Sequence, residues 1–339
     1  MKADEYKEPP PQAPAGDTDD DEPGLNAAAD DKPVEWRHGR VDGGQHGQRL
    51  DKVLVALAPE FSRSHLQRLL EAGHVRVDGS MAKASAQRVR AGQALELGLL
   101  PTEESRAFRP QPMALAVLHE DEHLLVLDKP AGLVVHPAPG HWQGTLLNGL
   151  LAHHAGAAAL PRAGIVHRLD KDTSGVMMVG KTLPAVTALV RAIAAREVQR
   201  RYRAISAPDR GVVPPQAFSV DAPIGRDPVS RLRMAVVATG RPARTDFEVE
   251  VAAGGFVGLR CTLHSGRTHQ IRVHAAHRGL PLVADALYGG RPALGLRRQA
   301  LHAFELALRH PVDGRALAFR CEPPDDFAAA WAALQLQWA

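Results

Sequence analysis

The densest group of polar side chains in this sequence is HRLDKDTSG, His167 to Gly175. It lies between an apolar stretch that ends at Val166 and the apolar segment VMMVGK. Loops flanked by strands are where rigid scaffolds hold reactive groups, so Asp170 among basic neighbours is a candidate catalytic carboxylate. The same arrangement is also typical of a structural ion pair, and local chemistry alone leaves both interpretations open.

Two further segments carry side chains suited to act with a carboxylate, GRTHQIR at 266–272 and RRYRA at 200–204. The guanidinium of Arg267 stays charged and is able to hold a carboxylate through two parallel hydrogen bonds. The ring of Tyr202 offers a flat surface on which a nucleic-acid base stacks. Taken alone, this arginine also fits a phosphate contact or a surface pair, and a strand tyrosine is more often part of a core.

Together these segments resemble the RluA family of RNA pseudouridine synthases. The similarity includes the runs LDKPAGLVVHPAPGHWQGTLLNGLL, PIGRDPVSRLRMAV and PLVADALYG, and it extends from about Leu50 to Phe327. The subgroup it resembles most acts on large-subunit ribosomal RNA. The reaction that the resemblance implies detaches uracil from its ribose, rotates it and reattaches it through carbon 5. Because this is an isomerisation, we expect no redox cofactor and no metal.

The resemblance also implies roles for individual residues. Asp170 is the catalytic carboxylate, acting as a nucleophile on the sugar or the base, or else as a base on the sugar. Arg267 keeps it ionised, since burial alone would raise its pKa. Tyr202 lies under the target ring, and Arg168 enters the space left by the flipped nucleotide. The sequence departs from the family at Asp227, where relatives commonly have histidine, and at HSGRTH, where threonine often precedes the glycine.

Other polar groups suggest different chemistry less well. The histidines at 264, 269, 274 and 277 lack the carboxylates or cysteines of a zinc site, so we expect no metal there. Ser174 and His167 are residue types found in hydrolase active sites, but the segment TSG is not the GxSxG of a nucleophile elbow. Cys261 and Cys321 are too few for a disulfide framework and are expected to be reduced thiols.

The N-terminal third predicts a small separate domain. Helices are expected at 48–57 and 62–73, followed by a strand in HVRVDG with a hairpin turn at Asp78-Gly79. Residues 47–100 resemble the S-four (ribosomal protein) type α/β RNA-binding domain. In that family the first two helices present basic side chains to the RNA backbone, and the matching residues here are Arg49, Lys52, Arg63 and Arg68. A merely solvated helix face is the alternative.

The remaining chain predicts an acidic disordered tail at 1–33, a linker at 101–112 and a catalytic domain at 113–339. Period-two patterns predict strands at 123–127, 175–180, 203–206, 247–251, 256–263 and 302–308. Helical patterns occur at 145–154, 183–197 and 268–277. Without regular βαβ alternation, the expected fold class is α+β, with a mixed, largely antiparallel β-sheet in the catalytic domain.

Charge and apolar patterning bear on partners and location. The net charge is only +3, but residues 1–32 contain ten Asp or Glu against three Lys or Arg, so the rest of the chain is strongly basic. A basic surface suits structured RNA, and by resemblance 23S ribosomal RNA or the assembling large subunit. No apolar run reaches the ~18 residues of a membrane span, so a cytoplasmic protein is expected. No coiled-coil or second interface motif suggests more than a monomer. The alternative function is an RNA-binding ribosome-assembly factor with a vestigial catalytic site.

Overall fold

The computed structural model describes residues 35–82, 84–99, 107–138, 140–230 and 232–336. The chain forms two compact units, which divide near residue 106. The predicted acidic tail at 1–33 lies outside the described residues, as do positions 101–106 of the predicted linker. None of the helices in the described ranges is long and apolar enough to cross a membrane.

The smaller unit packs two helices, α1 (Leu50–Leu57) and α2 (Arg63–Glu71), with a four-stranded sheet. The sheet has the order β1 (Glu35–Arg40), β4 (Ala94–Leu99), β2 (Val75–Val77) and β3 (Ser80–Met81). Both predicted helices are confirmed, and the Ser62 hydroxyl caps α2 by accepting a hydrogen bond from the backbone N–H of His65. The unit begins before the predicted boundary at 47, because β1 pairs with β4 along its whole length.

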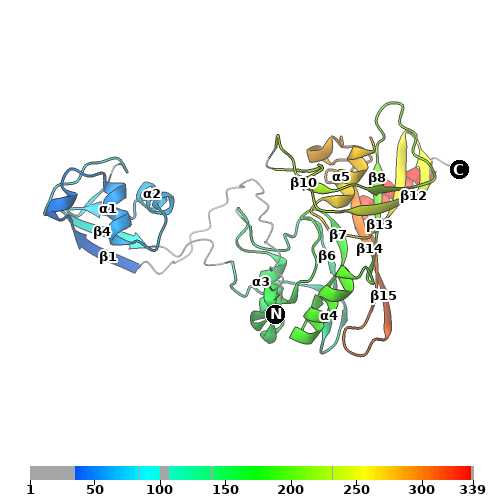
Figure 1. The fold of residues 1–339 in the computed structure, drawn as a ribbon, viewed down its shortest axis with the longest axis horizontal. Helices are drawn as coiled ribbons and strands as arrows, with labels where there is room; N and C mark the ends of the chain where they lie inside the picture. The colour runs from blue at the N-terminus through cyan, green and yellow to red at the C-terminus, as the bar shows by residue number, and fades with distance from the viewer. Residues whose placement is uncertain (1–34, 83, 100–106, 139, 231, 337–339) are drawn as a thin grey trace, which may run out of the picture. The chain divides into compact units, whose positions relative to one another are not determined.

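The larger unit is built on a nine-stranded sheet with the order β5-β6-β7-β14-β8-β13-β12-β9, and with β15 paired to β14 (Figure 1). Neighbouring strands are antiparallel except β7 and β14, which are parallel. This confirms the predicted α+β class with a mixed, largely antiparallel sheet. The strands are β5 (Ala116–Glu120), β6 (Leu124–Lys129), β7 (Ser174–Gly180), β8 (Gln199–Ser206), β9 (Ala217–Asp221), β12 (Arg244–Ala253), β13 (Phe256–Leu263), β14 (Leu301–Arg309) and β15 (Ala316–Arg320). A separate hairpin joins β10 (Ile224–Arg226) to β11 (Met234–Val236).

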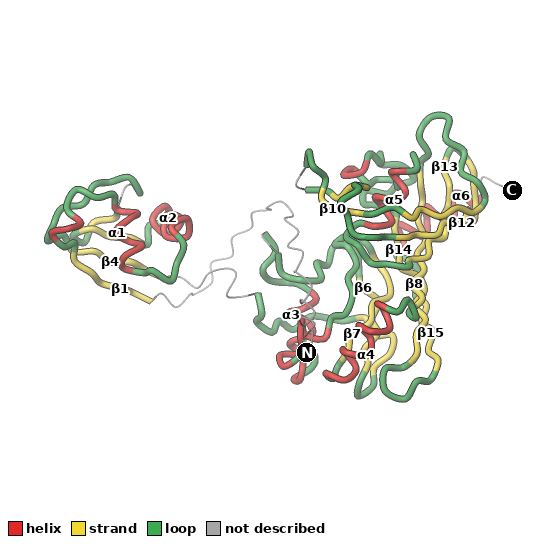
Figure 2. Tube along the Cα trace, in the orientation of Figure 1, coloured by secondary structure: helices red, strands yellow, loops and turns green. Residues whose placement is uncertain are grey.

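Helices cover both faces of this sheet. They are α3 (Leu146–His153), α4 (Leu183–Ala194), α5 (Gln270–His277) and α6 (Asp325–Leu336) (Figure 2). Successive strand residues point to opposite faces, so Met177 of β7 packs in the same core as α3 and α5, whereas Met178 packs against α4. In β8, Tyr202 belongs to the core shared with α5, and Ile205 packs with α6.

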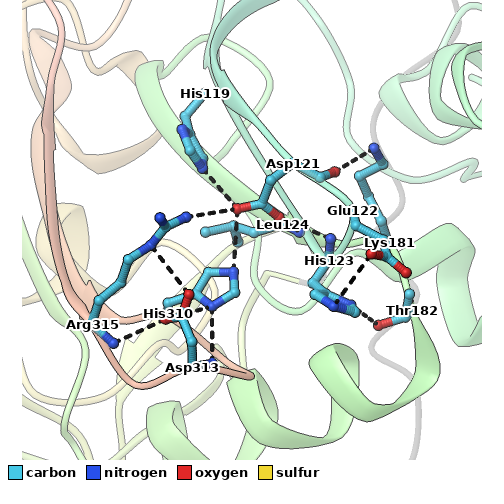
Figure 3. Close-up of polar contacts among 10 residues, drawn as sticks. All are labelled: His119, Asp121, Glu122, His123, Leu124, Lys181, Thr182, His310, Asp313 and Arg315. Atoms are coloured by element: carbon cyan, nitrogen blue, oxygen red, sulfur yellow. Dashed lines mark hydrogen bonds and ion pairs between the residues drawn. The ribbon is translucent and has the colours of Figure 1, made fainter.

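A cluster around Asp121 ties the β5–β6 turn to the β14–β15 hairpin (Figure 3). The carboxylate accepts hydrogen bonds from the backbone N–H groups of His123 and Leu124, each at 2.8 Å. The Nε2 atoms of His119 and His310 lie 3.0 and 3.2 Å from its other oxygen. Burial by itself would raise the pKa of Asp121, but these partners lower that pKa well below its usual range.

Candidate active site

The loop that carries Asp170 is fixed to the scaffold by one side-chain and one main-chain hydrogen bond. His167 precedes the carboxylate, and its Nε2 accepts a hydrogen bond from the backbone N–H of Met178 in β7 at 3.0 Å. Beyond it, the carbonyl of Lys171 accepts from the backbone N–H of Gly132 at 2.9 Å. The loop is therefore held on both sides of Asp170, which orders the carboxylate before any substrate binds.

Lys129 at the end of β6 is the third support of this loop. It is fully buried, and its Nζ donates to the carbonyls of Pro130, Leu133 and Lys171 at 2.8 to 2.9 Å. Burial lowers the pKa of Lys129 to about 7. The ammonium form of Lys129 has three N–H groups, which match these three carbonyl acceptors. Below that pH the charged lysine therefore donates a hydrogen bond to each of the three carbonyls.

The strand that follows the loop approaches β14 unusually closely. Gly175 has a φ of +120°, and a Cβ at this position would lie 2.2 Å from the carbonyl oxygen of Ala303. Glycine is therefore required where β7 begins its parallel pairing with β14. This close pairing fixes where the Asp170 loop ends and where strand β7 begins.

Asp170 is paired with Arg272, a residue in the first turn of α5. Arg272 Nη1 donates to Asp170 Oδ2 at 3.1 Å, while Nε and Nη2 donate to the two oxygens of Asp285 at 2.7 and 2.9 Å. The guanidinium also lies 5.0 Å from the ring centroid of Tyr288. Arg272 and Asp285 are both buried, so one rigid guanidinium is shared between two carboxylates.

The electrostatics keep Asp170 ionised. Burial would raise the pKa of this carboxyl, but the charges of His269, Arg272 and Arg168 outweigh burial and lower the pKa below its usual value. His269 itself has a left-handed backbone with a φ of 55° at the start of α5, and its Nδ1 lies 2.8 Å from the hydroxyl of Tyr288. The carboxylate is thus charged at neutral pH.

The structure corrects the predicted partner of Asp170. Arg267 lies in the turn before α5, where its Nε donates to the carbonyl of Pro242 at 3.3 Å and its backbone N–H donates to Gln270. Within the described residues, the ion pair of Asp170 is made by Arg272. Both arginines belong to GRTHQIR, and the helix start at Gln270 directs only the second one toward the carboxylate.

Tyr202 lies in β8 between Cys261 of β13 and Ala303 of β14 and is only 5% exposed. Burial raises the pKa of Tyr202 to about 12, and the charge of Asp170 adds to that rise. The phenol is therefore neutral near the carboxylate. Its assignment as the surface under the target ring stays a prediction.

A cavity of about 370 Å³ opens at Asp170. Its lining combines the charged groups Asp170, Arg168 and Arg272 with the apolar side chains Leu232 and Leu287. Charged groups beside apolar walls suit a flat, polar-edged ligand such as a nucleobase attached to its sugar. Arg168 thus lies at the same cavity as Asp170; of the residues described, Tyr202 and Arg267 do not line it.

In the smaller unit, two of the four predicted RNA contacts are held by an internal carboxylate. Asp51 is fully buried and accepts from Arg49 Nη2 at 2.9 Å and Arg63 Nη2 at 2.8 Å. The hydrogen bond from Arg49 contributes most to a lowered pKa of Asp51. Lys52 and Arg68 are exposed. Contact of these four residues with RNA stays a prediction.

The fold and this site define an RNA-modifying synthase with its own RNA-binding domain. Residues 123–277 match the family described as RNA pseudouridylate synthase, and residues 48–95 match the S4 domain. The chain belongs to the RNA pseudouridine synthase family, as the resemblance of its motifs predicts, and is an RNA pseudouridine synthase.

The chain is similar to curated relatives and to a solved structure over most of their length. The chain is 44% identical over 304 residues to ribosomal large subunit pseudouridine synthase D of Neisseria meningitidis serogroup B, covering 86% of this chain and 80% of the relative. It is also 44% identical to the enzyme of that name in Nitrosomonas europaea, covering 85% of each chain. The solved structure of human RNA pseudouridylate synthase domain containing 4 is similar with a TM-score of 0.51 and 25% identity, covering 65% of this chain and 93% of that one.

Proposed function

We propose that this protein isomerises specific uridines to pseudouridine in 23S large-subunit ribosomal RNA. The observation that carries the proposal is an ionised Asp170, held by Arg272 at the wall of a cavity. Relatives 44% identical over most of the chain are named as ribosomal large subunit pseudouridine synthases, which supports this substrate.

In the proposed reaction the target uridine leaves its stack and enters the cavity, because a base inside folded RNA does not reach a protein carboxylate. Asp170 then acts as a nucleophile on the sugar or base, or as a base on the sugar. The bond from N1 to the ribose is replaced by one from C5, and the C5 proton is lost as N1 gains one. Arg272 keeps Asp170 charged and oriented throughout.

Other site residues have supporting roles in this proposal. Tyr202 contacts the flipped ring, where stacking contributes ~1 to 3 kcal/mol. Arg168, at the cavity wall, enters the space that the nucleotide leaves. Arg267 lies in the turn next to the site and contacts the RNA backbone in place of its predicted pairing with Asp170. No cofactor takes part, since the reaction is a net isomerisation.

The smaller unit supplies affinity for structured RNA through Arg49, Lys52, Arg63 and Arg68. We further propose that the protein acts as a monomer in the cytoplasm, during assembly of the large subunit. The predicted alternative, an RNA-binding assembly factor with a vestigial site, gains no support from an intact ion pair between Asp170 and Arg272.

The substitution Asp170→Asn tests the reaction. We expect the variant to bind ribosomal RNA but to form no pseudouridine, because the amide has the shape of the carboxylate without its charge. Pseudouridine is mapped in 23S ribosomal RNA from cells that lack the protein and are complemented with wild type, Asp170→Asn or the exposed control Asp209→Asn. Specific sites restored by wild type and control alone support the proposal, and full modification by Asp170→Asn contradicts it.

A further inference from the structure

One buried cation near the active site is not explained by the reaction described above. Arg200 in β8 is only 5% exposed, and its Nε is buried without a hydrogen-bond partner. No residue that the structure describes reaches its guanidinium with a hydrogen bond or an ion pair. A buried charge that lacks a partner is costly, and proteins keep such groups where a ligand completes them.

The position of Arg200 relates it to the site. It lies two residues before Tyr202 on the same strand, so both side chains point to the sheet face that α5 covers. Its charge contributes to the lowered pKa of the buried His167, where burial is the larger cause. Arg200 therefore lies close to the first residue of the HRLDKDTSG segment.

The tip of Arg200 reaches the second motif loop at an exposed glycine. A Cβ built on Gly266 would lie 2.9 Å from Arg200 Nη1, so any larger residue would press on the guanidinium. Gly266 itself is exposed and immediately precedes Arg267. Because Gly266 is exposed and has no side chain, we take this position as the opening through which a ligand would reach the guanidinium.

The chemistry of the guanidinium indicates which group it receives. Burial lowers the pKa of Arg200, so its surroundings disfavour the charge as they stand. A neutral base carbonyl would leave that charge uncompensated, whereas a phosphate oxygen neutralises it and accepts two of its N–H groups. The neighbouring Arg201 is different, since it points to the other face and pairs with Glu305.

We propose that Arg200 is a phosphate-binding residue, which takes a backbone phosphate of the substrate RNA beside the flipped uridine through the opening at Gly266. This inference rests on the proposed function. The phosphate fixes the strand on the sheet face that also carries Tyr202, and the unpaired guanidinium of the free protein becomes paired only when RNA is bound.

The test compares Arg200→Met with Arg201→Met, both in the Asp170→Asn background so that binding is measured without turnover. We expect Arg200→Met to unfold at the same or a higher temperature, because it removes a buried, unpaired charge. Its affinity for an unmodified transcript of large-subunit ribosomal RNA should fall by about 10-fold, with a slope of log affinity against log salt smaller by about 0.7 to 0.9. Arg201→Met should do the reverse, losing thermal stability because the buried Glu305 loses a partner while RNA affinity stays unchanged.

A second variant tests the opening. Gly266→Ala should weaken RNA binding when Arg200 is present and add little to Arg200→Met, since both changes remove one contact. Unchanged affinity and salt slope in Arg200→Met would overturn the inference, as would a large loss of thermal stability in that variant. Failure of the proposed function is distinguished from this, because it appears as wild-type protein that forms no pseudouridine in the transcript.

Discussion

At the scale of single residues, the site depends on how the nitrogens of the Arg272 guanidinium are shared between two carboxylates. Arg272 uses Nε and Nη2 on Asp285 and leaves Nη1 for Asp170. Since Asp285 is buried and holds two of the three nitrogens, the arginine cannot rotate away when the substrate enters. Asp285 is thus a positioning residue that orients Arg272, and Arg272 orients the Asp170 carboxylate.

This sharing predicts that two matched substitutions, Arg272→Lys and Arg267→Lys, have unequal effects on kcat. Lysine at position 272 keeps a positive charge but does not reach both carboxylates, so Arg272→Lys should lower kcat by about 10²- to 10³-fold. Arg267→Lys should change kcat less than 10-fold and act mainly on KM, because Arg267 makes no pair with Asp170. Single-turnover and steady-state rates on ribosomal RNA measure both. Equal losses of kcat in the two variants would contradict the geometry.

The lowered pKa of Asp170 predicts a specific pH dependence. In the wild type this carboxyl is ionised above its ordinary value of 3.8, so its titration should produce no acid limb in the rate between pH 5 and 8. In Arg272→Gln, burial is opposed by fewer cations and the pKa rises, so the rate should fall as pH decreases toward 5. Single-turnover rates across this range show the limb.

A control separates this effect from a folding defect. Arg272→Gln also leaves the buried Asp285 without its partner, which destabilises the protein. The double variant with Asp285→Asn removes that orphaned charge, and it should keep the acid limb while unfolding at a higher temperature than Arg272→Gln. A pH profile identical to that of the wild type would show that Arg272 does not set the pKa of Asp170.

The sequence singles out Asp170 as the candidate carboxylate but not Arg272 as the arginine that pairs with it. The HRLDKDTSG motif draws attention to Asp170. The segment GRTHQIR contains two arginines, and nothing in its sequence shows which of them faces the carboxylate. The choice depends on the left-handed backbone of His269, which starts α5 and which no spacing rule predicts for a histidine. A usable signal was present, since an arginine between Ile271 and Val273 in an apolar helix needs a buried partner.

At the scale of elements, strands with buried residues are predicted from the sequence, whereas exposed strands at sheet edges are not. The strands β6, β7, β13 and β14 are recognised because their buried residues give apolar patterns. The strands β1 and β5 are missed since they lie at sheet edges, are mostly exposed and lack alternation. Helix α6 is different, because Phe327, Trp331 and Leu334 are spaced as on one helix face and this spacing indicates a helix.

The cluster in Figure 3 predicts an element-scale effect on stability. Asp121→Asn removes the charge that joins the β5–β6 turn to the β14–β15 hairpin, and should lower the free energy of unfolding by about 2 kcal/mol at pH 7. Because the folded pKa of Asp121 lies below its ordinary 3.8, its stabilisation is complete above that value. It is lost as pH falls through the folded pKa.

Urea unfolding of wild type and Asp121→Asn from pH 7 to pH 3 measures this contribution. The difference between the two proteins should be largest at neutral pH and should shrink below about pH 4. The exposed substitution Asp209→Asn serves as a control that should differ little from wild type at any pH. A difference that grows on acidification would show that the Asp121 carboxylate destabilises the folded protein.

At the scale of the whole molecule, the chain combines an S4 domain with a separate synthase unit. Each of its two units buries a separate apolar core, one around Leu54 and Leu97 and the other around Phe247 and Leu259. Substitutions on the surface of the smaller unit should therefore leave the Asp170 site intact. Changes confined to the smaller unit should alter RNA affinity without altering the reaction rate.

Two exposed basic residues of the smaller unit allow its contribution to RNA affinity to be measured. Replacing Lys52 and Arg68 together by glutamine should weaken binding to ribosomal RNA about 10-fold. It should also lower the slope of log affinity against log salt, because fewer counterions are released when fewer phosphates are contacted. The single-turnover rate at saturating RNA should stay unchanged. Arg49→Gln is a less clean probe, since it also removes a partner of the buried Asp51. An unchanged affinity would mean that these two side chains on α1 and α2 are only solvated. A reduced rate at saturation would mean that the smaller unit takes part in positioning the uridine.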